Sequence, residues 1–409
     1  MRPARRSGWP AGWLVAACLP VPVQAEWWTL DNTIESRFES NDNLFLAQRD
    51  PSHVNTVNLT DTLRASRRSE SASTRALLAA TALRSIGGGG IDRVDGRAGL
   101  TQTLSGPLDL YSLQADYAQD FNDAVQSADV TLGRGRRRTT TLSGSWVHSF
   151  TERLRATTQL SYVRTGYGQR LADASSFDDA SASVGANYQL NETDSLTARA
   201  GRSRFATRVG GRTSTTDDVN LGASRALSEQ GSISASIGAY RTTARQEFVV
   251  EACPIAASFC NAGLVARQSF VLTRSTASQG LQFDLSYRHQ YDERTSLVAS
   301  AARKQSPSGT GTVVTSDTIN ISAGRTLSET LSATLAYAQS RARFDTEGGG
   351  STSQRAVTAQ LTKQLADDTS LVATYQHTSA QLFGGAGSAK SNSISVSIKR
   401  EWPRVDASR

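Results

Sequence analysis

The chain has 409 residues, of which 38% are hydrophobic and 20% are charged, and its formal net charge is +7. Beyond the N-terminus it has no apolar run near the roughly 18 residues that a membrane-spanning helix needs, which excludes a helical membrane protein. The mean hydropathy of -0.37 does not exclude a membrane barrel, whose strands have one apolar and one polar face. The weak basic charge does not indicate a nucleic-acid partner.

Residues 1–25 are typical of an export signal peptide. Three arginines precede the apolar stretch "AGWLVAACLPVPV", and the following "VQA" suits cleavage after Ala25. A second interpretation stays open, because "LVAAC" resembles a lipobox that would leave a lipidated Cys18. Loss of the three arginines lowers the net charge of the mature chain to about +4.

From residue 26 onward the dominant hydrophobic period is two. In "SNSISVSIKREW", Ile394, Val396 and Ile398 share one parity with Trp402, while serines and charged residues take the other. The stretches "LRATTQLSY", "SISASIGAY" and "LQFDLSYRH" alternate in the same way. Such alternation predicts strands with one apolar and one polar face.

Short polar interruptions recur between these alternating runs. In "QLNETDSLTA" and "QLADDTSLVA", an even offset separates Leu190 from Leu196 and Leu365 from Leu371. The even offset keeps the apolar faces of an antiparallel pair on one side, and Asn, Asp and Ser favour turns, so each copy predicts a tight hairpin. Such turns recur near residues 68, 106, 151, 192, 229, 292, 328 and 366, and longer connections join the other strand ends.

Short turns at one end and long loops at the other are typical of bacterial outer-membrane barrels. The sequence therefore predicts an all-β fold over residues 26–402, a transmembrane antiparallel up-and-down β-barrel of about 18 strands, within a range of about 16 to 20. A repeat near 40 residues also suggests a β-propeller, but each repeat here holds two strands and not the four of a blade. We expect the chain in the outer membrane of a Gram-negative bacterium.

If the apolar parity faces outward, arginines occupy the outward parity near the long loops. At that level they would meet the phosphates of lipopolysaccharide, which guanidinium groups bind bidentately. The alternative is that long arginines extend to water at any membrane rim. These lipopolysaccharide-facing candidates are Arg164, Arg202, Arg204, Arg241, Arg303, Arg341 and Arg343.

The inward parity is polar and mildly basic, and a basic lumen favours anions through the field that it creates. The alternative is that these side chains pair across the lumen and only stabilise the wall. The clearest inward acids are Glu35, Asp95 and Asp284. The candidate lumen and substrate-facing residues are Arg64, Arg93, Arg97, Arg153, Arg155, Arg199, Arg288 and Lys399.

Cys253 and Cys260 are the only cysteines outside the export signal, and an exported chain with this spacing predicts a disulfide that closes a small loop. A metal site would lack companions, since the four histidines are scattered singly. The closed loop is a candidate pore constriction or surface epitope.

The sequence gives no sign of an enzyme, a catalytic residue or a cofactor. It lacks GxSxG, HExxH, paired-cysteine metal spacings and a phosphate-binding loop, and "IGGGGI" joins two predicted strands rather than a strand and a helix. Strands are expected from Trp27 or Trp28, directly after the signal, which leaves no room for a plug domain.

The last predicted strand ends at Trp402, an aromatic residue that would serve as the signal read by the barrel-assembly machinery. Residues 403–409, "PRVDASR", are expected to form a short periplasmic tail.

The opening "DNTIESRFESNDNLFLAQRD", the periodic turns and the arginine-rich strands resemble the outer-membrane barrel proteins found beside exopolysaccharide loci and exosortase-type sorting systems. The resemblance spans most of the mature chain. It implies an 18-strand-type barrel associated with exopolysaccharide secretion or assembly. The expected partners of the chain are outer-membrane lipids and lipopolysaccharide, the barrel-assembly machinery, polysaccharide and periplasmic secretion components. It supplies no catalytic residues.

Three functions are consistent with these features. The first is an outer-membrane channel that serves exopolysaccharide secretion through a mildly basic lumen, with many weak contacts rather than one tight site. The second is a general diffusion porin for small solutes. The third is a structural or docking barrel that does not conduct.

Overall fold

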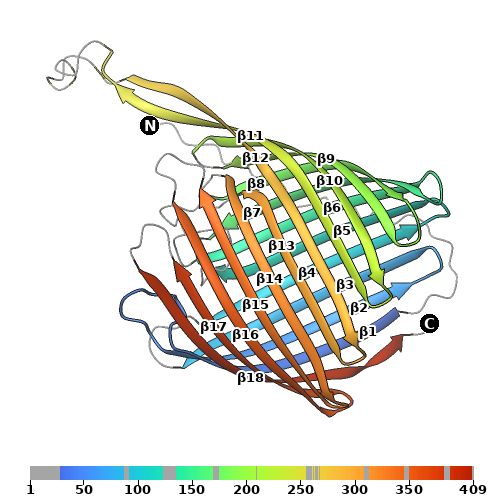
Figure 1. Cartoon of the computed structure of the whole chain (residues 1–409). Coiled ribbons are helices and arrows are strands. Elements are labelled where there is room, and N and C mark those ends of the chain that lie inside the picture. The colour runs from blue at the N-terminus through green and yellow to red at the C-terminus, as the bar shows by residue number, and fades with distance from the viewer. Residues whose placement is uncertain are drawn as a thin grey trace.

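The computed structural model describes residues 28–407, apart from 87–91, 123–134, 169–174, 209, 255–259, 261, 263–265, 267, 308–312, 345–349 and 382–386. The expected export signal, with Ala25 and Cys18, lies outside these residues. The described chain forms one antiparallel sheet of 18 strands, which closes because β1 pairs with both β2 and β18 (Figure 1).

The strands follow one another around the wall in chain order. They are β1 (Trp28–Asn41), β2 (Val54–Arg68), β3 (Ala72–Ile86), β4 (Arg93–Ser105), β5 (Asp109–Asn122), β6 (Gly135–Ser149), β7 (Leu154–Tyr167), β8 (Phe177–Gln189), β9 (Asp194–Thr207), β10 (Arg212–Ser228), β11 (Gly231–Ala252), β12 (Gln268–Asp292), β13 (Thr295–Pro307), β14 (Val313–Ser328), β15 (Leu331–Phe344), β16 (Ser351–Ala366), β17 (Thr369–Gln381) and β18 (Ser388–Ala407).

The recurrent polar interruptions are the tight turns. In the turn between β8 and β9, Asn191 Oδ1 accepts hydrogen bonds from the backbone N–H groups of Thr193 at 2.9 Å and Asp194 at 2.7 Å. The backbone N–H of Leu190 donates to the carbonyl of Asp194, so the asparagine side chain and the ladder close the turn together. All eight predicted tight turns lie between consecutive strands, and the prediction of an 18-strand barrel is confirmed.

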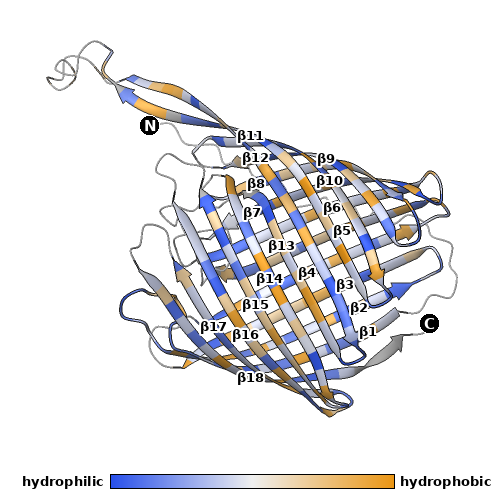
Figure 2. Cartoon of the chain, viewed as in Figure 1, coloured by the Kyte–Doolittle hydropathy of each residue, from blue (hydrophilic) through white to orange (hydrophobic). Residues whose placement is uncertain are grey.

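The two faces of the wall follow the alternation in the sequence. Cross-strand partners place Leu221, Ile237 and Phe283 side by side on the outer face of β10, β11 and β12. Leu221 is 62% exposed and Ile237 is 61% exposed, as expected of side chains that face lipid. Figure 2 shows apolar and polar residues alternating along the strands.

Aromatic side chains gather on the outer face near several tight turns. Tyr111 stacks on Trp146, and His148 contacts the edge of Phe150 with ring centroids 4.7 Å apart. The Trp146 indole N–H donates to Asp109 at 2.8 Å. Amphipathic rings of this kind suit the level of the lipid headgroups.

β11 and β12 extend past their neighbours. β10 pairs with β11 only as far as Gln246, and β13 pairs with β12 only from Phe283 to Asp292. The outer part of the hairpin therefore projects from the barrel rim, which Figure 1 shows at the upper left.

β18 does not end at Trp402. It continues to Ala407, and its last residues pair with Trp28, Thr29 and Leu30 of β1 across an irregularity in the ladder. The predicted strand end at Trp402 is therefore five residues too early, because residues 403–407 continue the backbone pairing with β1. Residues 408–409 lie outside the described chain, and the periplasmic location of this segment stays a prediction.

Candidate functional site: the lumen

The lumen face is the polar face of the strands. Seven of the eight predicted lumen residues lie on it, because their cross-strand partners alternate with the outward apolar residues. They are Arg64, Arg93, Arg97, Arg155, Arg199, Arg288 and Lys399. Arg153 lies in the tight turn between β6 and β7, where its carbonyl accepts the backbone N–H of Gln189. The part that these residues play in transport stays a prediction.

Several lumen bases have carboxylate partners. Arg64 meets Asp31 at 3.4 Å, and Arg93 Nε meets Asp95 Oδ2 at 2.8 Å. Lys399 pairs with Glu401. Sequence reasoning identified Asp95 as an inward acid and placed Glu401 on the same polar parity as Lys399. It missed Asp31, whose position opposite Arg64 is set by the register between β1 and β2.

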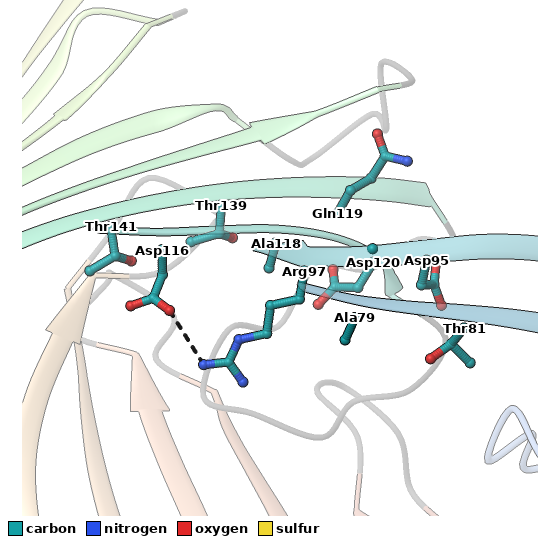
Figure 3. A pocket seen from close by; sticks show the side chains of 11 residues that line it. Ala79, Thr81, Asp95, Arg97, Asp116, Ala118, Gln119, Asp120, Thr139 and Thr141 are labelled. Carbon is teal, nitrogen blue, oxygen red and sulfur yellow. Dashed lines mark ion pairs between the residues drawn. The ribbon is translucent and has the colours of Figure 1, made fainter. Parts of the chain in front are cut away.

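A pocket of about 410 Å³ lies on the inner wall between β3 and β6. In Figure 3, Arg97 extends toward Asp116, and the closest N–O distance of this ion pair is 3.6 Å. Gly99 makes this arrangement possible, because a Cβ there would lie 2.8 Å from Asp116 Oδ1. The pocket is lined by Ala79, Thr81, Asp95, Gly96, Arg97, Asp116, Ala118, Gln119, Asp120, Thr139 and Thr141.

Asp120 adds a third carboxylate to this part of the wall, beside Asp95 and Asp116. Arg137 donates to both of its oxygens, at 3.0 Å from Nε and 2.8 Å from Nη2. Neither residue was identified from the sequence, since both lie beside the long connection between β5 and β6. The pocket lining therefore holds three carboxylates and one arginine, and Arg93 and Arg137 pair with two of those carboxylates from beside the pocket, so the surface is not purely basic.

Four lumen arginines form a different group. Arg75, Arg155, Arg199 and Arg288 are exposed, and none of them has an ion pair within the part of the chain that the structure describes. Each lies in the half of its strand nearest a tight turn. We call them the lumen arginine group. Arg75 was missed, because the run "RALLAATAL" gives no clear parity.

The lumen face of β14 to β17 has the opposite character. Among the described side chains of these four strands no charged residue faces inward, and the inward side chains are hydroxyls, amides and small apolar groups. Representative members are Ser316, Thr318, Asn320, Thr334, Gln354, Gln360 and Thr374. The lumen therefore has a charged side and an uncharged polar side.

The loop between β1 and β2 is fixed to the rim. Asn43 is buried and donates to the carbonyls of Ala47 at 2.9 Å and Lys390 at 2.8 Å. Leu46 is also buried, against Ala380 and Ala389, which belong to the lumen faces of β17 and β18. This is the "DNLFL" segment, and it packs on the lumen side of the wall at β17 and β18.

The outward arginines lie near the long loops, as the parity predicts, but with acids that sequence reasoning missed. Asp178, Asp217 and Asp317 share their face. Arg164 pairs with Asp178 at 2.9 Å, Arg202 pairs with Asp217, and Arg303 and Arg343 both pair with Asp317. Arg204, Arg241 and Arg341 also face outward. Contact of any of them with lipopolysaccharide stays a prediction.

Cys253 and Cys260 are joined, with an S–S distance of 2.10 Å. Cys253 directly follows β11, at the projecting end of the β11–β12 hairpin. The disulfide therefore lies beyond the rim, since the strands that lead to it leave the barrel wall. This position favours the surface-epitope interpretation over a pore constriction, and the role of the loop stays a prediction. Trp402 faces outward near the tight turns, with the Arg400 guanidinium 5.2 Å from its ring centroid; its role in assembly stays a prediction.

Within the described ranges, no group of three or more His, Cys, Asp or Glu side chains could hold a metal ion. Nor does that part of the chain contain a helix long and apolar enough to span a membrane.

Comparisons with known proteins show which solved structures this chain resembles in fold. The chain matches no family model and no curated protein sequence. Among solved structures, OccAB4 of Acinetobacter baumannii aligns with a TM-score of 0.50 at 8% identity, covering 93% of this chain and all of that one. OccK8 (OprE) of Pseudomonas aeruginosa aligns at 0.48 and 12% identity, covering 92% and 98%. OpdK of the same organism, solved with vanillate, aligns at 0.46 and 10% identity, covering 92% and 99%. At these identities the likeness concerns the fold alone.

Proposed function

We propose that this chain is a passive diffusion channel of the bacterial outer membrane for small polar solutes, with a preference for anions. A closed barrel with an apolar exterior and a polar lumen is the architecture of such channels. The neighbouring folds belong to outer-membrane porins of the Occ/OprD family, which are small-solute diffusion channels. This supports the general porin hypothesis over exopolysaccharide secretion.

The observation that carries the anion preference is the lumen arginine group. Arg75, Arg155, Arg199 and Arg288 are exposed on several sides of the lumen and have no ion-pair partner within the described residues. Exposed cations in a confined aqueous pore raise the local concentration of anions. The uncharged side formed by β14 to β17 offers hydroxyl and amide groups to the rest of a solute without holding it tightly.

The test is the reversal potential in a planar bilayer under a salt gradient. Changing Arg75, Arg155, Arg199 and Arg288 together to Gln is expected to reduce anion selectivity while the pore stays open, because the lumen loses four unpaired cations. A matched variant removes the same charge from the outer face, at Arg84, Arg136, Arg325 and Arg355, and is expected to keep the native reversal potential. Unchanged selectivity in the lumen variant would refute the proposal.

Exopolysaccharide export is a second candidate, supported by the family resemblance and by the uncharged side of the lumen. The hydroxyls and amides of β14 to β17 can form many weak hydrogen bonds with neutral sugars. Deleting the gene should then abolish polymer export at normal polymer synthesis. Normal export in the deletion strain would eliminate this candidate and leave the small-solute channel.

A further inference from the structure

The outer wall of β9, β10 and β11 carries polar side chains that the lumen does not use. They form rows across the three strands just below the long loops, defined by the cross-strand partners. The first row is Arg202, Asp217 and Arg241; the second is Arg204, Thr215 and Thr243; the third is Ala206, Thr213 and Arg245.

The single carboxylate in these rows is already occupied. Arg202 donates to Asp217 in a bidentate arrangement, from Nε to Oδ1 at 2.5 Å and from Nη2 to Oδ2 at 3.1 Å. Arg204, Arg241 and Arg245 have no ion pair within the part of the chain that the structure describes, and all three are exposed. The patch therefore holds an excess of positive charge on a wall that faces lipid.

The spacing suits a phosphate group. Neighbouring strands lie about 4.8 Å apart, so guanidinium groups from β9 and β11 can converge over the strand between them. Thr215 occupies the centre of the second row and Thr243 its β11 end, and neither hydroxyl has a side-chain hydrogen-bond partner among the described residues. Guanidinium groups and hydroxyls together supply the donors that three phosphate oxygens accept.

The location of these residues on the barrel indicates which molecule would supply the phosphate. These residues lie on the outer face, in the half of the wall next to the long loops, and long loops of outer-membrane barrels face the cell exterior. We propose that Arg204, Arg241 and Arg245, with Thr215 and Thr243, form a binding site for a phosphate on the headgroup of a phosphorylated glycolipid in the outer leaflet. The site is independent of what passes through the lumen.

A similar arrangement on β13 to β15 supports this assignment. Arg303, Asp317 and Arg341 form a row there, and Arg303 and Arg343 both bond to Asp317. Arg341 is left without an ion pair among the described residues. This second row has fewer unpaired cations, so the β9–β11 site is expected to bind more tightly.

The experiment measures binding of bisphosphorylated lipid A to the mature chain in detergent by native mass spectrometry. Changing Arg204, Arg241 and Arg245 to Gln is expected to weaken binding by at least about tenfold, because three charge-assisted contacts are lost. The matched control R155Q/R199Q/R288Q removes the same charge from the lumen and is expected to bind lipid A like the native chain. Equal weakening in the control, or none in the outer variant, would overturn the proposal.

Two further lipids test whether the site recognises the phosphate of a glycolipid headgroup. Lipid A without its phosphates should bind at least about tenfold more weakly than the bisphosphorylated form, and phosphatidylglycerol should also bind more weakly, since it offers a single diester phosphate. Equal binding of either probe would overturn the assignment to a phosphorylated glycolipid headgroup. If the triple variant fails to form a barrel, Arg204→Gln and Thr215→Val are measured singly, with a smaller loss expected from each.

Discussion

Gly99 and Asp116 show how one residue without a side chain shapes the charge of the lumen. Asp116 lies over Gly99 in the adjacent strand and reaches Arg97. The sequence shows a basic parity on β4, but the balancing carboxylate comes from β5 and depends on the register between the two strands. This is why Arg97 was identified from the sequence and its partner was not.

Gly99→Ala is expected to displace the Asp116 carboxylate, because the new Cβ would lie 2.8 Å from Oδ1 at the far end of a flexible side chain. The barrel should form normally, since only that side chain needs to move. Arg97 would lose its partner, and the reversal potential should shift toward greater anion selectivity. The control is Gly96→Ala, whose Cβ would meet only the carbonyl of Ala79 at 3.9 Å. A Gly99→Ala pore with native selectivity would contradict this account.

Asn43 fixes the first loop to the rim, and its removal should free that loop. Asn43→Ala leaves the carbonyls of Ala47 and Lys390 and the backbone N–H of Ala47 without their partner, at a cost of about 1–3 kcal/mol for each group that stays buried. Trypsin added from outside should then cleave faster after Arg49. Gln48→Ala is the control variant, since the hydrogen bond from the Gln48 side-chain amide to the carbonyl of Gly387 is exposed to solvent. Equal cleavage rates for the two variants would show that Asn43 does not hold the loop.

At the scale of elements, the hydrophobic period and the turn residues were enough to place the strands. Every tight turn repeats the same pattern, in which turn-forming polar residues separate two apolar residues by an even offset. These two features were not enough for β3, where Leu77 and Leu78 are adjacent. Pairing with β2 decides the matter by placing Leu78 opposite Leu63 on the outer face and Leu77 opposite Arg64 in the lumen. Alternation also does not reveal that β11 and β12 extend beyond β10 and β13. The sequence pattern of a strand is the same whether or not a neighbouring strand pairs with it.

The projecting hairpin leads to a prediction about its disulfide. Changing Cys253 and Cys260 to Ser is expected to leave single-channel conductance and selectivity unchanged, because the strands that carry the bond leave the wall before reaching it. Protease resistance of the hairpin should fall, since the covalent closure constrains the loop. A change in conductance under reducing conditions, absent in the double Ser variant, would mean that the hairpin tip reaches the pore.

At the scale of the whole molecule, one barrel presents two different chemistries. The outer wall is apolar in the middle, with aromatic rings near tight turns and arginine–aspartate rows near the long loops. The inner wall combines a charged side with an uncharged side from β14 to β17. The fold class and strand count follow from the sequence because a membrane requires a closed, alternating wall. The outward acids Asp178, Asp217 and Asp317 were not predictable from the sequence. Each is stabilised by an arginine on a neighbouring strand, and the sequence of a single strand does not show which residue lies beside it.

The most direct test of the channel proposal is single-channel recording of the refolded mature chain in a planar bilayer under a salt gradient. The lumen arginine group predicts a stable conductance with a reversal potential on the anion side. Stable insertion without conductance would contradict the diffusion-channel proposal and favour a structural or docking barrel. Conductance with cation selectivity would contradict the role assigned to Arg75, Arg155, Arg199 and Arg288.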